Sequence, residues 1–268
     1  MRRRLEAELV RRGLAATSED ARRIVADGRV TVAGRPAGNP DTLVAADEPV
    51  SVGREPREFV SRGGQKLAPA LDRFSVDATG SRCLDAGAAT GGFTDVLLSR
   101  GADHVVAVDV GYGELAWELR NDPRVTVMER TNVRSLRPGD LPYAPNLIVA
   151  DLSFISLAVV VPVLSDVAAP RADLVLLVKP QFETAMAEVG EGGVVTDPAA
   201  WRAAVERVAA ACARVGMGIK ALAPSSLPGP AGNIEFFVHG RRGQPGHSFD
   251  LDAAMAEAED LRRGVKAR

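Results

Sequence analysis

The stretch Cys83–Phe93, CLDAGAATGGF, determines how the rest of the chain is interpreted. It begins as an apolar strand, continues as a glycine-rich turn and leads into a helical pattern over residues 92–100. Glycine allows the backbone to turn sharply and to approach a ligand closely. The spacing is not the Gly-x-Gly-x-x-Gly of dinucleotide-binding folds, so the turn predicts another ligand or a purely structural role.

On both sides of this turn, apolar strands alternate with helical segments. Strands are expected at residues 82–85, 104–109, 125–128, 146–151, 173–179, 217–222 and 234–239. Helices are expected at residues 66–74, 92–100, 113–120, 155–168, 198–215 and 249–268. This alternation predicts an α/β fold with a seven-stranded, mainly parallel sheet covered by helices on both faces. In such a sheet, ligands bind in the crevice beyond the carboxyl ends of the strands.

The N-terminal residues carry a different pattern. Apolar side chains share one face of a first helix, which would start at Arg4 and end at Gly13. A second helix with capping residues at its start is expected at 17–27. Short strands are expected at residues 29–34 and 50–52. We therefore expect a small α+β domain over residues 1–53.

Charge is distributed unevenly along the chain. Residues 1–40 carry nine arginines against five acidic residues, although the formal net charge of the whole chain is only −2. The asymmetry predicts that the small domain meets a polyanion, with a solvated helix face as the alternative. A charged, proline-containing linker is expected at residues 54–63, followed by the larger domain at 64–268.

Composition argues against several other classes of protein. The start of the chain lacks the apolar stretch of a signal peptide, and no eighteen-residue apolar run is present. Two cysteines do not suit a disulfide scaffold, and Cys83 is expected in the core of a strand. The three histidines lack metal-ligand spacing. We expect a cytoplasmic protein with no membrane segment and no metal.

Lysine is rare in this chain. Only four lysines occur, against twenty-nine arginines. Lys66 follows the segment Ser61–Gln65, SRGGQ, and Lys179 ends the apolar run Leu174–Val178. Arginine cannot give up its proton in a protein, whereas a buried lysine can. Lys179 is therefore a candidate general base, and a strand end that is charged by chance is the alternative.

The glycine-rich turn resembles the S-adenosylmethionine loop of class I, Rossmann-like methyltransferases. Asp85 suits the ammonium group of that cofactor, directly or through water, and Asp109 ends the next strand, where it could accept from ribose hydroxyls. Phe154 could stack on the adenine or belong to the core. The residues expected to bind the cofactor are Asp85, Gly87, Ala88, Thr90, Gly91, Gly92, Phe93, Asp109, Asn132 and Phe154.

The small domain resembles an S4 RNA-binding domain. The resemblance rests on the pattern Arg-Leu-x-x-x-Leu-Val-x-x-Gly-Leu from Arg4, the capped second helix, and Gly-x-Val-x-Val-x-Gly from Gly28. It implies that the two helices lie against structured RNA. The arginines expected to contact RNA are Arg2, Arg3, Arg4, Arg11, Arg12, Arg22 and Arg62.

Four further residues complete the resemblance. Lys66, Asp151, Lys179 and Glu235 occur in the order of the Lys-Asp-Lys-Glu tetrad of FtsJ-like ribose 2′-O-methyltransferases. Glu235 starts the last strand, which we expect to run antiparallel at the sheet edge. With the S4-like domain, five motifs make the chain similar to the TlyA family. They lie at Val60–Gly64, Asp85–Phe93, Asp151–Ser156, Val178–Glu183 and Pro228–Glu235.

The resemblance implies a specific activity. It implies methylation of a cytidine ribose in 16S ribosomal RNA, in 23S ribosomal RNA or in both, with S-adenosylmethionine as donor and Lys179 as general base. The partner would be ribosomal RNA or a ribosomal subunit, and the enzyme would act as a monomer. One alternative is an RNA-binding assembly protein with an inactive methyltransferase fold. Another is a haemolysin, a label that this family has also carried.

Overall fold

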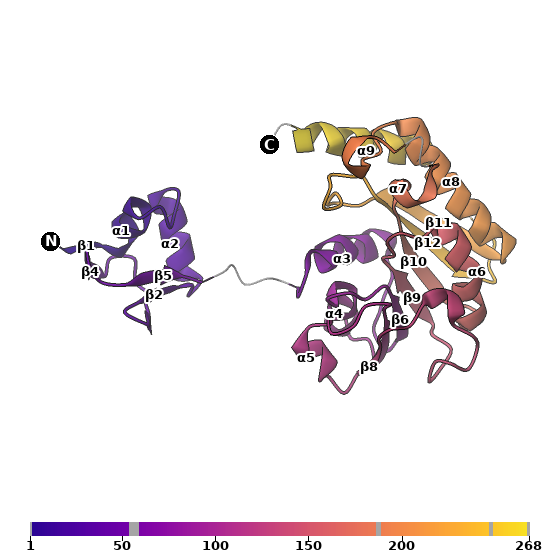
Figure 1. Cartoon of the computed structure of the whole chain (residues 1–268), viewed down its shortest axis with the longest axis horizontal. Coiled ribbons are helices and arrows are strands. Elements are labelled where there is room, and N and C mark those ends of the chain that lie inside the picture. The colour runs from indigo at the N-terminus through magenta and orange to yellow at the C-terminus, as the bar shows by residue number, and fades with distance from the viewer. Residues whose placement is uncertain (1, 54–58, 186–188, 247–248, 267–268) are drawn as a thin grey trace. The chain divides into compact units, whose positions relative to one another are not determined.

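The computed structural model describes residues 2–53, 59–185, 189–246 and 249–266. The chain divides into two compact units, Met1–Arg57 and Glu58–Arg268 (Figure 1). Residues 54–58 of the expected linker lie outside the described residues.

The N-terminal unit contains two helices and short strands. Helices α1 (Leu5–Arg11) and α2 (Ser18–Ala26) share a small apolar core with strand β2 (Val30–Val32). Strand β2 pairs in antiparallel fashion with β3 (Arg35–Pro36) and β5 (Val50–Val52). The expected α+β architecture of this unit is confirmed.

The first residues of this unit differ from expectation. Arg2–Arg4 form strand β1, so the helix expected to start at Arg4 begins one residue later, at Leu5. β1 pairs in antiparallel fashion with β4 (Leu43–Ala45), and Arg3 lies opposite Val44. Helical spacing within 4–13 could not reveal this pairing, because the partner strand is distant in sequence.

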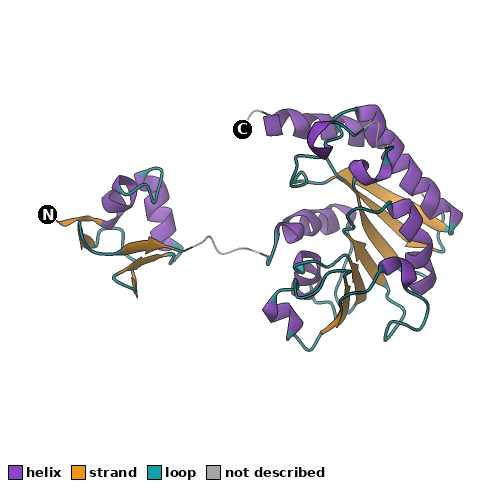
Figure 2. Cartoon of the chain, viewed as in Figure 1, coloured by secondary structure: helices purple, strands orange, loops and turns teal. Residues whose placement is uncertain are grey.

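The larger unit contains one seven-stranded sheet in the order β11-β12-β10-β9-β6-β7-β8. Figure 2 draws its strands in orange among the purple helices. Its strands are β6 (Arg82–Ala86), β7 (His104–Val108), β8 (Val125–Met128), β9 (Leu147–Ala150), β10 (Asp173–Val178), β11 (Met217–Pro224) and β12 (Phe236–Arg242). The strands from β10 to β8 in this order pair in parallel, and β12 is antiparallel to both of its neighbours. The predicted mainly parallel sheet is confirmed. The expectation of β12 at the edge is wrong, because β11 pairs along its outer side.

Helices cover both faces of this sheet (Figure 1). On one face, α3 (Arg62–Phe74) and α4 (Gly92–Ser99) share a core with inward side chains of the strands. On the other face, α6 (Leu157–Val167), α8 (Pro198–Arg214) and α9 (Leu251–Lys266) do the same. Apolar residues fill both faces of the central strands, which explains why those strands read as continuous apolar runs.

The shorter helical turns are α5 (Trp117–Arg120), α7 (Pro180–Glu183), η1 (Val133–Ser135) and η3 (Glu191–Gly193). The helix expected at 113–120 is thus confined to its last turn. Gly113 has a left-handed backbone with φ of +76°. Its N–H donates to Glu129 Oε1 at 2.8 Å, so the segment before α5 is held as a loop from the neighbouring strand end.

Candidate active site

Polar side chains gather where the strands of the larger unit end. Asp109, Asp151 and Lys179 directly follow β7, β9 and β10, and Glu235 directly precedes the antiparallel β12. The start of β12 and the ends of β9 and β10 lie at the same edge of the sheet. Side chains that are far apart in sequence therefore meet at this edge, as expected for a doubly wound fold.

Lys66 and Glu235 form a buried ion pair. Lys66 projects from α3, and its Nζ lies 2.7 Å from Glu235 Oε2. Burial raises the pKa of Glu235, and the charges of Lys66 and Lys179 act in the opposite direction. The loop that precedes Glu235 also passes close to its carboxylate. A Cβ on Gly229 would lie only 2.5 Å from Glu235 Oε1. Glycine at this position leaves room for the carboxylate.

Lys179 lies beside two oxygen-bearing side chains. Its Nζ is 2.6 Å from Asp151 Oδ1, a contact between charges that is not aligned as a hydrogen bond. Nζ donates a hydrogen bond to Ser153 Oγ at 2.9 Å. The amine is therefore oriented from two positions on the loop that follows β9. The sequence predicts no role for Ser153, although this residue lies within the Asp151–Ser156 motif.

The two lysine–carboxylate pairs open into one cavity of about 520 Å³. Lys66, Asp151, Lys179 and Glu235 all line it. The structure thus brings the four residues of the expected tetrad together. Arg62 also lines this cavity, and its Nη2 donates to Pro228 O at 3.2 Å.

A second cavity of about 320 Å³ lies beside the glycine-rich turn. Of the expected cofactor residues, Gly87, Asp109, Asn132 and Phe154 line it. Asp109 accepts hydrogen bonds from the backbone N–H of Ala89 at 2.8 Å and of Gly111 at 2.7 Å. A Cβ on Gly87 would lie 2.5 Å from Asp151 O, so glycine lets the turn and the strand end approach. Asp151, Ser153 and Phe154 line both cavities, so the two cavities are neighbours beside Lys179, which contacts Asp151 and Ser153.

Asp85 lies beneath this cavity wall, not on it. The carboxyl group is fully buried, and its Oδ2 accepts a hydrogen bond from Thr94 Oγ1 at 2.7 Å. Burial raises the pKa of Asp85 to about 7. Its Oδ1 has no hydrogen-bond partner among the described residues. An unpaired buried acceptor is costly, so this atom fits a donor that arrives with a ligand or with water.

The other expected cofactor residues of the turn lie outside both cavities in this structure. They are Ala88, Thr90, Gly91, Gly92 and Phe93. A Cβ on Gly91 would lie 2.3 Å from a methyl group of Leu119, and one on Gly92 would lie 2.2 Å from Ser61 Oγ. These glycines allow helix α4 to start close to its neighbours.

Phe154 is not a core residue. Its side chain is 92% exposed, and its ring lies 5.1 Å from that of Phe182, measured between centroids. Its backbone is left-handed, with φ of +61°. This conformation costs a residue with a Cβ about 1–2 kcal/mol. The strain indicates that surrounding contacts fix the loop, and the exposure excludes the expectation of a core position.

Glu183 is a second residue for which the sequence predicts no role, although it ends the Val178–Glu183 motif. It is the last residue of α7, and only 2% of it is exposed. Its carboxylate accepts hydrogen bonds from Ser156 Oγ and from the backbone N–H of Leu157, both at 2.6 Å. Burial raises the pKa of Glu183, and these two donors oppose the shift.

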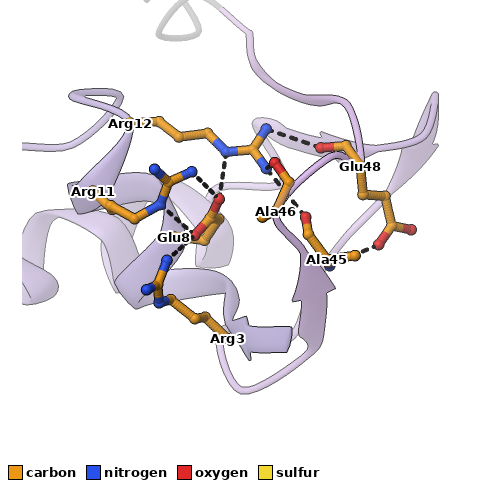
Figure 3. Close-up of polar contacts among 7 residues, drawn as sticks. All are labelled: Arg3, Glu8, Arg11, Arg12, Ala45, Ala46 and Glu48. Carbon is orange, nitrogen blue, oxygen red and sulfur yellow. Dashed lines mark hydrogen bonds and ion pairs between the residues drawn. The ribbon is translucent and has the colours of Figure 1, made fainter. Parts of the chain in front are cut away.

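In the N-terminal unit, Glu8 collects three arginines (Figure 3). Glu8 is buried, and its oxygens lie 2.6 Å from Arg11 Nη2, 2.7 Å from Arg12 Nε and 3.8 Å from Arg3 Nη1. Hydrogen bonds from Arg11 and then Arg12 lower the pKa of Glu8 to about 2. Arg12 also donates to the carbonyls of Ala45, Ala46 and Glu48, so its guanidinium is used within the fold.

The other arginines of this unit that are expected to contact RNA lie on β1 and α2. Arg2, Arg3 and Arg4 are exposed on β1, and Arg4 Nη1 lies 3.2 Å from Asp41 Oδ1. Arg22 pairs with Glu6 across the two helices. Several of these side chains therefore combine exposure with an internal partner that limits their motion.

Among the residues that the structure describes, no helix is long and apolar enough to cross a membrane.

Comparisons with known proteins agree with this architecture. The model of the FtsJ-like methyltransferase family matches residues 59–242, and that of the S4 domain matches residues 3–50. The 16S/23S rRNA (cytidine-2′-O)-methyltransferase TlyA of Mycobacterium tuberculosis is 52% identical over 241 residues, covering 88% of this chain and 89% of that protein. The Bacillus subtilis protein YqxC, provisionally described as an rRNA methyltransferase, is 40% identical and covers 99% of this chain and 96% of its own.

A solved structure extends the similarity to three dimensions. A Streptococcus thermophilus protein, provisionally described as a hemolysin, superposes with a TM-score of 0.75 at 33% identity, covering 100% of this chain and 99% of that one. Both domains, their order and nearly the whole length are thus shared with these relatives. The chain belongs to the TlyA family, which joins an S4 domain to an FtsJ-like methyltransferase domain.

Proposed function

We propose that this chain methylates the 2′-hydroxyl of cytidine in ribosomal RNA, with S-adenosylmethionine as methyl donor and Lys179 as general base. One observation carries the proposal above the others. The Lys179–Asp151 contact lines both the tetrad cavity and, through Asp151, the cavity beside the glycine-rich turn. A base and a methyl donor must meet at one point, and the two cavities are neighbours beside Lys179.

The cavity beside the turn fits the proposed cofactor. S-adenosylmethionine supplies a methyl group bound to a positively charged sulfur. Asp109, at the end of β7, offers carboxylate oxygens to ribose hydroxyls, and the unpaired Oδ1 of Asp85 suits the ammonium group through water or a local adjustment. Asn132 lines the wall where an adenine could be held. The acidic lining is complementary to a cationic ligand.

Lys179 would remove the proton from the substrate. A ribose 2′-hydroxyl is a poor nucleophile, and it improves when a positioned base takes its proton during transfer. The uncharged amine of Lys179 would accept the proton of the hydroxyl. Bound S-adenosylmethionine would supply the methyl group, and its sulfur would leave as the neutral thioether of S-adenosylhomocysteine. Ser153 and Asp151 hold the amine in place. Positioning of this kind supplies much of the rate enhancement, because the reacting atoms must align at about 3 Å.

The second lysine would hold the substrate. Lys66 is held in place by its hydrogen bond to Glu235, and both residues line the tetrad cavity. A cation fixed in this way could contact the ribose or its phosphate. Arg62 lies on that wall as a further cation for the RNA backbone.

The division of labour follows the two domains. We propose that residues 1–53 bind RNA through their arginines, that 54–63 link the domains, and that 64–268 carry out methyl transfer. The partner is ribosomal RNA or a ribosomal subunit, so the enzyme would act in the cytoplasm, and we propose that it acts as a monomer.

The proposal is tested by mapping ribose methylation on rRNA from cells with and without the gene, together with transfer of labelled methyl groups to rRNA by the purified protein. Loss of specific 2′-O-methyl cytidines on deletion is the expected result. Unchanged methylation in cells, with no transfer in vitro, would instead favour an RNA-binding protein without activity. Titration calorimetry with S-adenosylmethionine then shows whether the cofactor site itself is functional.

A further inference from the structure

We propose that Glu183 is a positioning residue that fixes the loop after β9 against the segment that carries Lys179. The inference rests on the proposed function, because it concerns the geometry of the base. Glu183 lines neither cavity, so it would act through the residues it holds and not on the substrate.

The contacts of Glu183 join two segments that both belong to the site. Helix α7 starts directly after Lys179 and ends at Glu183. The carboxylate reaches across to Ser156 Oγ and to the N–H of Leu157, the first residue of α6. Ser156 in turn accepts from Ala158 N at 3.1 Å, so the same hydroxyl also caps α6. A carboxylate at a helix N-terminus is further stabilised by the helix dipole.

These contacts connect the loop after β9 to the segment Lys179–Glu183 at both ends. At one end, Lys179 contacts Asp151 and Ser153. At the other end, Glu183 bonds Ser156 and Leu157. Between them lie the rings of Phe154 and Phe182. Each segment is thus held at both of its ends, and the position of Lys179 relative to Asp151 depends on the far end as well as the near one.

The backbone of Phe154 supports this interpretation. A non-glycine residue in the left-handed region persists only where its surroundings determine the conformation. Phe154 has φ of +61°, and its ring is mostly exposed, so packing of that ring into a core does not hold it. The bonds to Glu183 begin two residues later, at Ser156. These hydrogen bonds hold the end of the loop in place, and we infer that they help to keep Phe154 in its left-handed conformation.

Two substitutions in the full chain test the inference. Glu183→Gln removes the negative charge. It also replaces one of the two acceptor oxygens with an NH2 group, which faces the donors Ser156 Oγ and Leu157 N–H. Ser156→Ala removes one of the two bonds. We expect Glu183→Gln to lower kcat by about 10- to 100-fold, because a shift of about 1 Å in a reacting group has effects of that size. KM for S-adenosylmethionine should change less than threefold, as a rough bound for residues that line neither cavity.

A double-mutant cycle separates positioning from general damage. If the two residues act through their contact, Ser156→Ala should add little in the Glu183→Gln background. Asp173→Asn is the matched control, since Asp173 is a partly buried carboxylate at the opposite end of β10, bonded to His239 and Arg241. It should lower stability and leave the kcat of the folded enzyme unchanged.

A readout without substrate keeps the inference independent of the proposed function. Amide hydrogen exchange should become faster across residues 152–158 in Glu183→Gln, and not in Asp173→Asn. Wild-type protein that transfers no methyl group would overturn the proposed function and leave this exchange result to decide the structural role. Unchanged exchange in that loop, additive effects in the cycle, or a kcat loss equal to that of Asp173→Asn would overturn the positioning role. If Glu183→Gln does not fold, Ser156→Ala alone must show the exchange and kcat effects.

Discussion

Lys66 Nζ lies 2.7 Å from Glu235 Oε2, although the two residues are 169 positions apart in the chain. Both side chains are almost completely buried. Helix α3 and the start of β12 are therefore fixed to one another by charge inside the larger unit. A buried pair of this kind is costly to break, because the remaining charge has neither water nor a partner.

Lys66→Met is expected to destabilise the larger unit by about 3–5 kcal/mol, the usual cost of removing one partner of a buried pair. Since burial already raises the pKa of Glu235 and Lys66 opposes that shift, the variant should leave Glu235 protonated at higher pH than in the wild type. Urea unfolding measures the loss.

Two comparisons make this prediction specific. Lys66→Met combined with Glu235→Gln should recover part of the stability while methyl transfer stays low. Arg73 lies on α3, like Lys66, and forms an exposed ion pair with Glu257 of α9, so Arg73→Met should cost no more than about 1 kcal/mol. Equal losses for Lys66→Met and Arg73→Met would show that the buried pair has no special role in stability.

Lys179→Arg should abolish methyl transfer while keeping affinity for S-adenosylmethionine. Arginine preserves the positive charge beside Asp151, but its guanidinium does not give up a proton in a protein. Loss of a general base lowers kcat by about 10²- to 10⁴-fold. Single-turnover transfer to rRNA and calorimetry with the cofactor measure the two quantities separately.

The matched control is Lys220→Arg on β11, which lines neither cavity. It should leave turnover within about twofold, as for a surface substitution away from the site. A Lys179→Arg enzyme that still turns over normally would remove the base assignment and leave Lys179 as a charge that holds Asp151.

The sequence predicted the fold better than the details of the site, and particular residues show why. Alternating apolar runs predicted the strands, because burial on both faces leaves a local record. The sequence did not predict which strands lie beside β12, since an edge strand and its inner neighbour can have the same apolar pattern. The pairing of Arg2–Arg4 with Leu43–Ala45 was equally invisible, because it depends on residues distant in sequence.

The site shows the same division. Lys179 and Asp151 could be placed in one crevice, because both directly follow parallel strands. Glu183 could not be recognised, since its role depends on hydrogen bonds to Ser156 and Leu157 across two loops. Asp85 was correctly placed at a strand end, but a motif does not show that its carboxyl group would be fully buried.

The N-terminal unit should lose stability in acid through Glu8. Its folded-state pKa of about 2 lies below the ordinary value of 4.5. A lowered pKa contributes stability that is fully present above the ordinary value and is lost as pH falls toward the folded value. The loss should therefore develop between about pH 4.5 and pH 2. Amide exchange in residues 2–53, corrected for intrinsic rates, measures it.

Glu8→Gln is the comparison for this titration. It should be less stable than wild type at neutral pH, because three arginines lose their shared anion. It should also show a smaller acid-induced loss in the same window. Glu6, which pairs with Arg22 and also has a lowered pKa, accounts for part of the remaining dependence. An unchanged acid profile in Glu8→Gln would assign the acid sensitivity to other carboxylates.

Arg11 and Arg12 are adjacent in sequence and should nevertheless respond differently to substitution. The side chain of Arg11 is 46% exposed, whereas that of Arg12 is 20% exposed and donates to three backbone carbonyls. Arg11→Gln should weaken binding to an rRNA transcript and reduce the slope of log affinity against log salt by about 0.7–0.9, the value for one lost phosphate contact. Arg12→Gln should instead destabilise residues 2–53, because the turn at 45–48 loses its donor. Filter binding at several salt concentrations, with exchange measured in parallel, distinguishes the two effects. A reduced salt slope for Arg12→Gln in a fully folded domain would mean that its guanidinium leaves these carbonyls to bind RNA, and the two arginines would then form one binding surface.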